Sequence, residues 1–135
     1  MTLVVLDASV AVAWALPSQS TRAADDLAKR RLELRLAAPG IFWHEVRNAL
    51  LAFERRGRIA PSVVDAELST LEKSVTLIDD GAPEDIFALA RAERLSIYDA
   101  CYLDLALRAG AELASRDTAL LAAGGRRGAR LYDAR

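Results

Sequence analysis

Short apolar runs alternate along this chain with longer amphipathic segments. Leu3-Val4-Val5-Leu6 is a continuous apolar run, which is typical of a strand buried on both faces of a parallel sheet. Further short strands are predicted at 36–38, 75–78, 112–115 and 130–132. The intervening segments repeat their apolar residues at helical spacing, which predicts helices over 9–14, 20–34, 41–56, 61–73, 83–94, 96–108 and 118–123.

Turn residues separate these elements. Pro17 stops the first helix, Gly57 and Gly110 close two others, and Pro39-Gly40 and Gly124-Gly125 turn the chain. Strands that alternate with helices predict an α/β fold with a mostly parallel sheet and helices on both faces. With no repeat or linker in its 135 residues, the chain is expected to form a single domain over 1–135.

Composition narrows the class of protein. Hydrophobic residues make up 53% and charged residues 27%, a balance typical of globular proteins. One cysteine, Cys101, and one histidine, His44, argue against disulfides, a zinc site and thiol catalysis. The longest apolar run, 10–16, is far shorter than the ~20 residues of a membrane-spanning helix. We expect a cytoplasmic protein that does not enter a membrane.

The net charge of −1 gives no general attraction to nucleic acid. Basic residues nevertheless gather in three clusters, whose simplest interpretation is solvated helix faces and whose alternative is a local track for RNA. The clusters are Lys29-Arg30-Arg31, Arg55-Arg56 with Arg58, and Arg126-Arg127 with Arg130.

Four acids lie where predicted elements begin or end. Asp7 directly follows the first strand and Asp117 follows a later one, while Glu45 and Asp99 lie in the first turns of helices. Each has an ordinary explanation: Asp7 or Ser9 as a helix cap, Glu45 at a helix dipole, Asp99 in a capping box, Asp117 as a cap. Together they are expected at one edge of a parallel sheet, where ligands bind in such folds.

Carboxylates gathered in one place repel each other, and a divalent cation relieves that repulsion. Oxygen ligands without thiolate or imidazole favour Mg²⁺, with Mn²⁺ possible. Such an ion binds phosphate oxygens and activates water, which suits phosphodiester hydrolysis. The hydroxyls of Ser9, Ser115 or Thr118 are placed to support the carboxylates. Glycine-rich phosphate loops and a G-x-S-x-G nucleophile elbow are missing from the sequence.

Four motifs in order make the chain resemble the PIN-domain ribonucleases, and in detail the VapC toxins. They are Leu-Asp7-Ala-Ser9-Val, Glu45-Val-Arg-Asn-Ala-Leu, Tyr98-Asp99-Ala-Cys-Tyr-Leu-Asp-Leu-Ala and Ser115-Arg-Asp117. The resemblance covers essentially the whole chain and implies a three-layer α/β/α fold. It also implies a Mg²⁺- or Mn²⁺-dependent endoribonuclease that is the toxin of a toxin–antitoxin pair.

Residue by residue, the resemblance makes Asp7 and Asp99 primary metal ligands. Glu45 would hold metal directly or through water, or help to activate the attacking water, and Asp117 would complete the site. Ser9 and Ser115 match the small hydroxyl positions of the family. The resemblance further implies a homodimer, a cognate antitoxin, and a transfer or ribosomal RNA substrate.

Alternatives remain open at this point. They are a non-catalytic PIN-like binding module, a stand-alone RNA-processing nuclease, and a metal-dependent phosphatase or nuclease acting on DNA. A haloacid-dehalogenase-like phosphatase would need an acid two residues after Asp7, where Ser9 stands. A receiver domain would need a mid-chain acid at a strand end and a late lysine, and the late lysine is missing from this sequence.

Other residues have simpler interpretations. Asp104 is interpreted as a surface or helix-pair acid, and Asp79-Asp80 as turn residues. His44 and Arg47 neighbour Glu45 and are candidates for RNA contacts or for helix packing. The aromatic residues are interpreted as core or dimer contacts rather than base-stacking platforms: Trp14, Phe42, Trp43, Phe53 and Tyr102.

Overall fold

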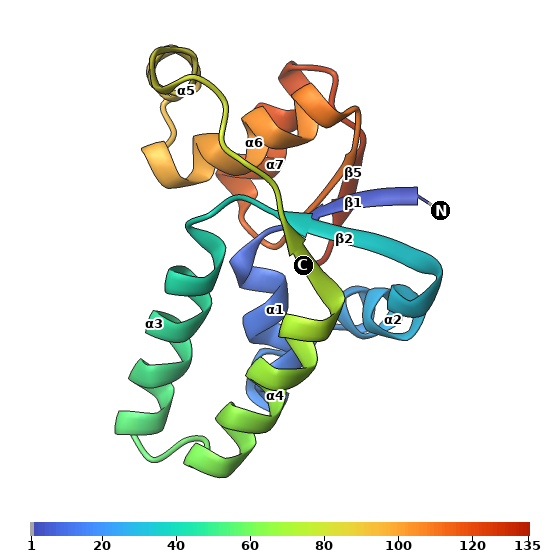
Figure 1. Ribbon diagram of the computed structural model, residues 1–135, viewed down its shortest axis with the longest axis vertical. Helices are drawn as coiled ribbons and strands as arrows, with labels where there is room; N and C mark the ends of the chain where they lie inside the picture. The colour runs from blue at the N-terminus through green and yellow to red at the C-terminus, as the bar shows by residue number, and fades with distance from the viewer. Residues whose placement is uncertain (1) are drawn as a thin grey trace.

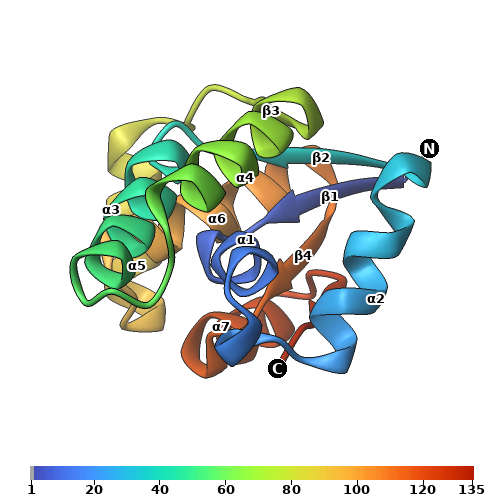
Figure 2. The same ribbon diagram turned by 90° about the horizontal axis from the view of Figure 1, so that it is seen from below.

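The computed structural model describes residues 2–135 and contains one central sheet (Figures 1 and 2). The strand order is β3-β2-β1-β4-β5, and every neighbouring pair is parallel. The strands are β1 (Thr2–Leu6), β2 (Leu34–Ala38), β3 (Val75–Leu77), β4 (Glu112–Ser115) and β5 (Leu131–Asp133).

Helices connect each strand to the next. They are α1 (Ala8–Ala15), α2 (Arg22–Arg30), α3 (Phe42–Arg55), α4 (Pro61–Ser74), α5 (Pro83–Glu93), α6 (Ile97–Ala109) and α7 (Thr118–Arg126). Two short 3₁₀ turns, η1 (Pro17–Gln19) and η2 (Arg31–Glu33), follow α1 and α2.

The helices form two layers with the sheet between them. Figure 1 shows α1 to α4 below the sheet and α5 to α7 above it. The chain builds outward from β1 to β2 and β3, then returns to add β4 and β5 on the other side of β1. Because parallel connections are right-handed, this reversal of direction sends the later helices to the opposite face. The predicted three-layer α/β/α fold is confirmed.

The central strand β1 lies between β2 and β4 and is buried. Val4, Val5 and Leu6 are at most 1% exposed, as expected for a strand covered on both faces. Val4 pairs with Leu36 on one side and with Glu112 on the other. The ladder extends past the strand, since the Asp7 amide donates to the carbonyl of Ala114 at 3.0 Å. The backbone that presents Asp7 is therefore anchored in the sheet.

The predicted parallel sheet is confirmed, and every pair of neighbouring strands in it is parallel. The predicted elements are largely confirmed, with two corrections. The helix predicted over 20–34 ends at Arg30, because Leu34 begins β2 and pairs with Thr2. Gly124 and Gly125 lie inside α7 instead of turning the chain. A Cβ on Gly124 would lie 2.7 Å from a methyl of Leu131, so glycine there permits close packing of α7 on β5.

The strand order reverses between β1 and β4, which places a topological switch point at their carboxyl ends. In open parallel sheets this is the position where ligands bind. Asp7 follows β1 and Ser115 ends β4, so both lie at the switch point. Separately, no helix within residues 2–135 is long and apolar enough to cross a membrane.

We predict that the core depends strongly on the buried side of α3. Leu50 is fully buried, whereas its neighbour Leu51 is 38% exposed. Leu50→Ala is expected to lower the free energy of unfolding by about 2–5 kcal/mol, and Leu51→Ala by less than about 1 kcal/mol. Urea unfolding of the two variants checks this. Equal losses would show that α3 does not pack as described.

Candidate active site

Asp7 lies at the floor of the site. Its side chain is 5% exposed, and its Oδ2 accepts hydrogen bonds from Ser9 Oγ at 2.7 Å and Ser115 Oγ at 2.8 Å. The same hydroxyls accept from backbone amides, Ser9 from Arg116 at 3.1 Å and Ser115 from Asp117 at 2.9 Å. Asp7 occupies the N-cap position of α1 but makes no capping hydrogen bond through its side chain. The alternative in which Asp7 or Ser9 caps this helix is therefore wrong.

The surroundings of Asp7 disfavour the charged form of its carboxyl group. Burial raises the pKa of this carboxyl, and the hydrogen bonds from Ser9 and Ser115 oppose that rise. The nearby acids Glu45 and Asp117 raise the pKa further. Asp7 is thus a buried carboxyl that hydrogen bonds hold in place and that neighbouring charges disfavour as an anion.

Glu45 approaches from the first turn of α3. The hydroxyl of Tyr102, on α6, donates to Glu45 Oε1 at 2.7 Å. Partial burial raises the pKa of Glu45, the bond from Tyr102 lowers it, and Asp99 raises it. Burial, followed by this same contact, raises the pKa of Tyr102 far above its usual range, so the phenol remains a donor.

Asp99 lies in the first turn of α6, where Ser96 caps the helix by accepting from the Asp99 amide at 3.0 Å. The predicted Ser96 cap is confirmed. Partial burial raises the pKa of Asp99 to about 6, and the charges of Asp7 and Asp117 add to the rise. The capping box explains the position of Asp99 on its helix. It does not explain why Asp99 lies near Asp7 and Asp117.

Asp117 has a structural function that the sequence predicted. It is the N-cap of α7, and its Oδ1 accepts from the Leu120 amide at 2.8 Å. Its charge also raises the pKa of both Asp7 and Asp99. Capping and proximity to the other acids therefore coexist at this residue.

The electrostatic effects connect all four acids. In addition to burial, Glu45 and Asp117 raise the pKa of Asp7. In the same way, Asp7 and Asp117 raise the pKa of Asp99, and Asp99 raises that of Glu45. Across residues 2–135, none of the four forms a salt bridge with a basic side chain. The site is a group of like charges from four elements with no internal counter-ion.

Asp99 lies near the other acids for a reason that differs from the expected one, which was a helix that directly follows a strand. The helix that carries it follows α5 rather than a strand. Because α6 precedes β4 and packs against β1 and β4, it runs antiparallel to the strands, and its N-terminus lies at their carboxyl edge. Glu45 follows the expected route, since α3 comes directly after β2.

The donor set has the chemistry that a hard cation requires. Its members are carboxylates and hydroxyls, which suit Mg²⁺ or Mn²⁺ better than zinc. In the part of the chain that the structure describes, no three acidic, cysteine or histidine side chains are close enough to hold one ion as they stand. Metal binding would therefore require these side chains to draw together.

Tyr102 is the residue of the site that sequence reasoning missed. It was assigned to the core, and it is fully buried, but its hydroxyl binds Glu45. The available signal was its position three residues after Asp99, which places both on one side of a helix.

Residues outside the site have the structural functions that their positions suggest. Asp104 pairs with Arg108 within α6 at 2.7 Å. Arg47 pairs with Glu72 at 2.8 Å and lies over the ring of Trp43, while His44 is exposed.

Glu93 and Cys101 also lie outside the site. Glu93 binds both Arg126 and Arg127, which gives part of one basic cluster a structural function. Burial raises the pKa of the Cys101 thiol to about 11, which keeps it protonated and excludes it as a nucleophile.

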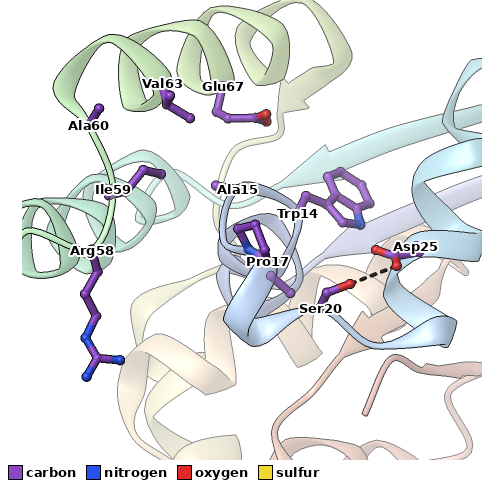
Figure 3. Close-up of a pocket in the computed structure, with 11 residues that line it drawn as sticks. Trp14, Ala15, Pro17, Ser20, Asp25, Arg58, Ile59, Ala60, Val63 and Glu67 are labelled. Atoms are coloured by element: carbon purple, nitrogen blue, oxygen red, sulfur yellow. Dashed lines mark hydrogen bonds between the residues drawn. The ribbon is translucent and has the colours of Figure 1, made fainter.

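A groove of about 740 Å³ lies apart from the acids (Figure 3). Figure 3 shows Trp14 and Pro17 on one side, Val63 and Glu67 on the other, and the hydrogen bond from Ser20 to Asp25. None of the four acids of the site lines this groove, so its size does not make it the catalytic cleft.

The raised pKa of Asp99 predicts a dependence of stability on pH. The folded state holds this proton more tightly than the unfolded state, so metal-free protein should lose stability as pH rises from about 4 through about 6. Asp99→Asn removes that penalty and is expected to raise the melting temperature at pH 7.5 by about 2–5 °C, with a smaller gain at pH 5, where only part of the penalty has developed.

Thermal melts in EDTA between pH 5 and 7.5 measure this difference. The window lies above the region where Asp133, whose pKa its hydrogen bonds with Arg135 lower to about 2, loses its charge. Parallel pH profiles for the two proteins would mean that folding does not raise the pKa of Asp99.

Comparison with known proteins places the fold. Residues 4–125 match the PIN domain family. PAE2754 from Pyrobaculum aerophilum has a similar structure, with a TM-score of 0.78 and 25% identity over 97% of this chain and 90% of that one.

Two more structures each have a TM-score of 0.66. VapBC2 from Rickettsia felis, bound to a DNA fragment from its promoter, is 13% identical and is covered over 98% of both chains. FitAcB from Neisseria gonorrhoeae is 14% identical and is covered over 96% of both chains. The search of curated proteins gave no match. With its family match spanning all but the ends of the chain and four acids gathered at the switch point of its sheet, the chain belongs to the PIN-domain family.

Proposed function

We propose that this chain is a metal-dependent endoribonuclease, the toxin of a toxin–antitoxin pair, and that residues 1–135 act as one catalytic domain. The observation that carries the proposal is the group of four acids, from four elements, without a basic partner among residues 2–135. Membership of a family whose domains are generally nucleases supports it.

Asp7 and Asp99 are the side chains that we assign as primary ligands of a divalent cation, Mg²⁺ or Mn²⁺. Glu45 and Asp117 would complete the site directly or through water. When bound, such a cation would neutralise the carboxylates, bind the phosphodiester oxygens and lower the pKa of a water molecule.

The chain's own residues have distinct functions in this scheme. Ser9 and Ser115 orient the carboxylate of Asp7 through Oδ2, and we assign Oδ1 as the atom that would bind the cation. The bond from Tyr102 occupies Oε1 of Glu45, so we assign Oε2 as the atom that would face the cation, directly or through a water molecule whose proton it would accept. Water adds to phosphorus as the bond to the leaving oxygen breaks; the attacking water gives up one proton to Glu45 or to solvent, and the leaving oxygen takes one up from solvent water.

The proposed partners are an RNA and an antitoxin protein. VapBC2 and FitAcB have this fold, and the motifs of the chain resemble those of VapC toxins, which supports a cognate antitoxin. We propose RNA of the transfer or ribosomal class as the substrate, a homodimer as the assembly and the cytoplasm as the location.

RNA cleavage tests the catalytic proposal. The purified chain, freed of any bound partner, is incubated with total cellular RNA in Mg²⁺, Mn²⁺ or EDTA. Discrete fragments are expected with either metal and none with EDTA. Asp99→Asn should abolish them, because it removes a charged ligand.

Asp104→Asn is the matched control. Asp104 lies on the same helix but pairs with Arg108 at the surface, so this variant should cleave as the unchanged chain does. Intact RNA in every lane, from folded protein, would contradict the nuclease proposal and favour a binding module.

The toxin proposal predicts a cellular effect. Expression of the chain in cells without its antitoxin is expected to stop growth, because RNA cleavage would continue unchecked. Asp7→Ala should restore growth, since it removes the buried carboxylate of the site. Growth curves with equal protein levels check this, and normal growth on expressing the active nuclease would instead support a stand-alone processing enzyme.

A further inference from the structure

We propose that Tyr102 is a positioning residue that holds Glu45 in the geometry needed to bind a divalent cation. This inference rests on the proposed function, because it concerns the same site. It assigns a function to a core residue that is not itself an acid of the site.

The contact is well defined. Tyr102 is fully buried, and its hydroxyl donates to Glu45 Oε1 at 2.7 Å across 57 positions of sequence. This bond joins α6 to α3, and thus connects the two helix layers that lie on opposite faces of the sheet. A buried phenol without an acceptor is costly, so the hydroxyl of Tyr102 and the carboxylate of Glu45 constrain each other.

The placement has a consequence for two acids at once. Asp99 lies three residues before Tyr102 on α6, so both project from the same side of one helix. The helix fixes the backbone of Asp99, and the bond from Tyr102 holds Oε1 of Glu45. One rigid helix therefore sets the separation of two carboxylates that would otherwise move apart under their mutual repulsion.

Glu45 needs such a restraint more than Asp7 does. Asp7 is short, buried and bound by two hydroxyls. Glu45 has a longer side chain and is only partly buried. Within residues 2–135, the bond from Tyr102 is the one hydrogen bond that its side chain accepts. Loss of that bond would free Oε1, and Oε2 would then no longer be held in one direction.

Tyr132 provides a matched control. Its hydroxyl also donates at 2.7 Å, but to the backbone carbonyl of Ala23 on α2 rather than to an acid of the site. Tyr102→Phe and Tyr132→Phe therefore each remove one phenol hydroxyl and one hydrogen bond of equal length. A difference between them in metal binding reports on the position of the hydroxyl rather than on its loss.

The experiment measures Mn²⁺ binding by electron paramagnetic resonance and thermal melting in EDTA. We expect Tyr102→Phe to weaken Mn²⁺ affinity about 10- to 100-fold, as is usual when a group that orients a metal ligand is removed. Its melting temperature should fall no further than that of Tyr132→Phe, which should retain full affinity. Equal Mn²⁺ affinity in the two variants would overturn the inference.

A double-mutant cycle protects the test against a general effect on folding. In the Glu45→Ala background, Tyr102→Phe should cause no further loss of Mn²⁺ affinity, because its partner is already missing. It should also raise the melting temperature of that background, since the orphaned hydroxyl is removed. A second, additive loss of affinity would show that Tyr102 acts through the core.

The outcomes also separate this inference from the proposed function. If the unchanged chain neither binds Mn²⁺ nor cleaves RNA, the proposed function fails. If it does both and Tyr102→Phe binds Mn²⁺ equally well, only the positioning function of Tyr102 is wrong.

Discussion

The buried carboxylate of Asp7 is the constraint around which the rest of the site is arranged. A charged group in this position is costly unless hydrogen bonds offset the loss of water. Ser9 and Ser115 provide those bonds from α1 and from the end of β4. The two strands must therefore end side by side for the carboxylate to be held, and the parallel pairing of β1 with β4 brings this about.

The same arrangement conflicts with stability. Four acids come together without a basic partner in the chain from 2 to 135, and burial, with repulsion added to it, raises the pKa of Asp7, Glu45 and Asp99. Stability alone would favour apolar or paired residues at these positions. Sites that break such local rules are usually functional, and a bound cation is the simplest agent that removes the conflict.

Much of this could be predicted from sequence because the governing patterns are local. The apolar run of β1, the Ser96 cap and the strand–acid boundary at Asp7 are each readable within a few residues. The route of Asp99 could not be predicted in the same way, because it depends on α6 running antiparallel to the sheet after a helix rather than a strand. The bond from Tyr102 to Glu45 spans 57 positions, and no local pattern records it.

Gly124 illustrates a different limit. Glycine pairs usually indicate turns, but here the missing side chain serves packing, because Leu131 of β5 fills the space where a Cβ would lie. Whether a glycine is selected for its backbone freedom or for its size is decided by a neighbour distant in sequence. Local reasoning therefore assigned the turn to the wrong residues.

Burial also gives the site a direction. Asp7 is almost fully buried and is restrained by Ser9 and Ser115, whereas Glu45, Asp99 and Asp117 are all partly exposed. Asp7 thus forms the floor and the other three form the rim. Any ligand that enters from solvent meets the partly exposed acids of the rim, Asp99 and Glu45 among them, before it meets Asp7. Their separation therefore matters most for what the site can bind, and α6 carries both Asp99 and the tyrosine that holds Glu45.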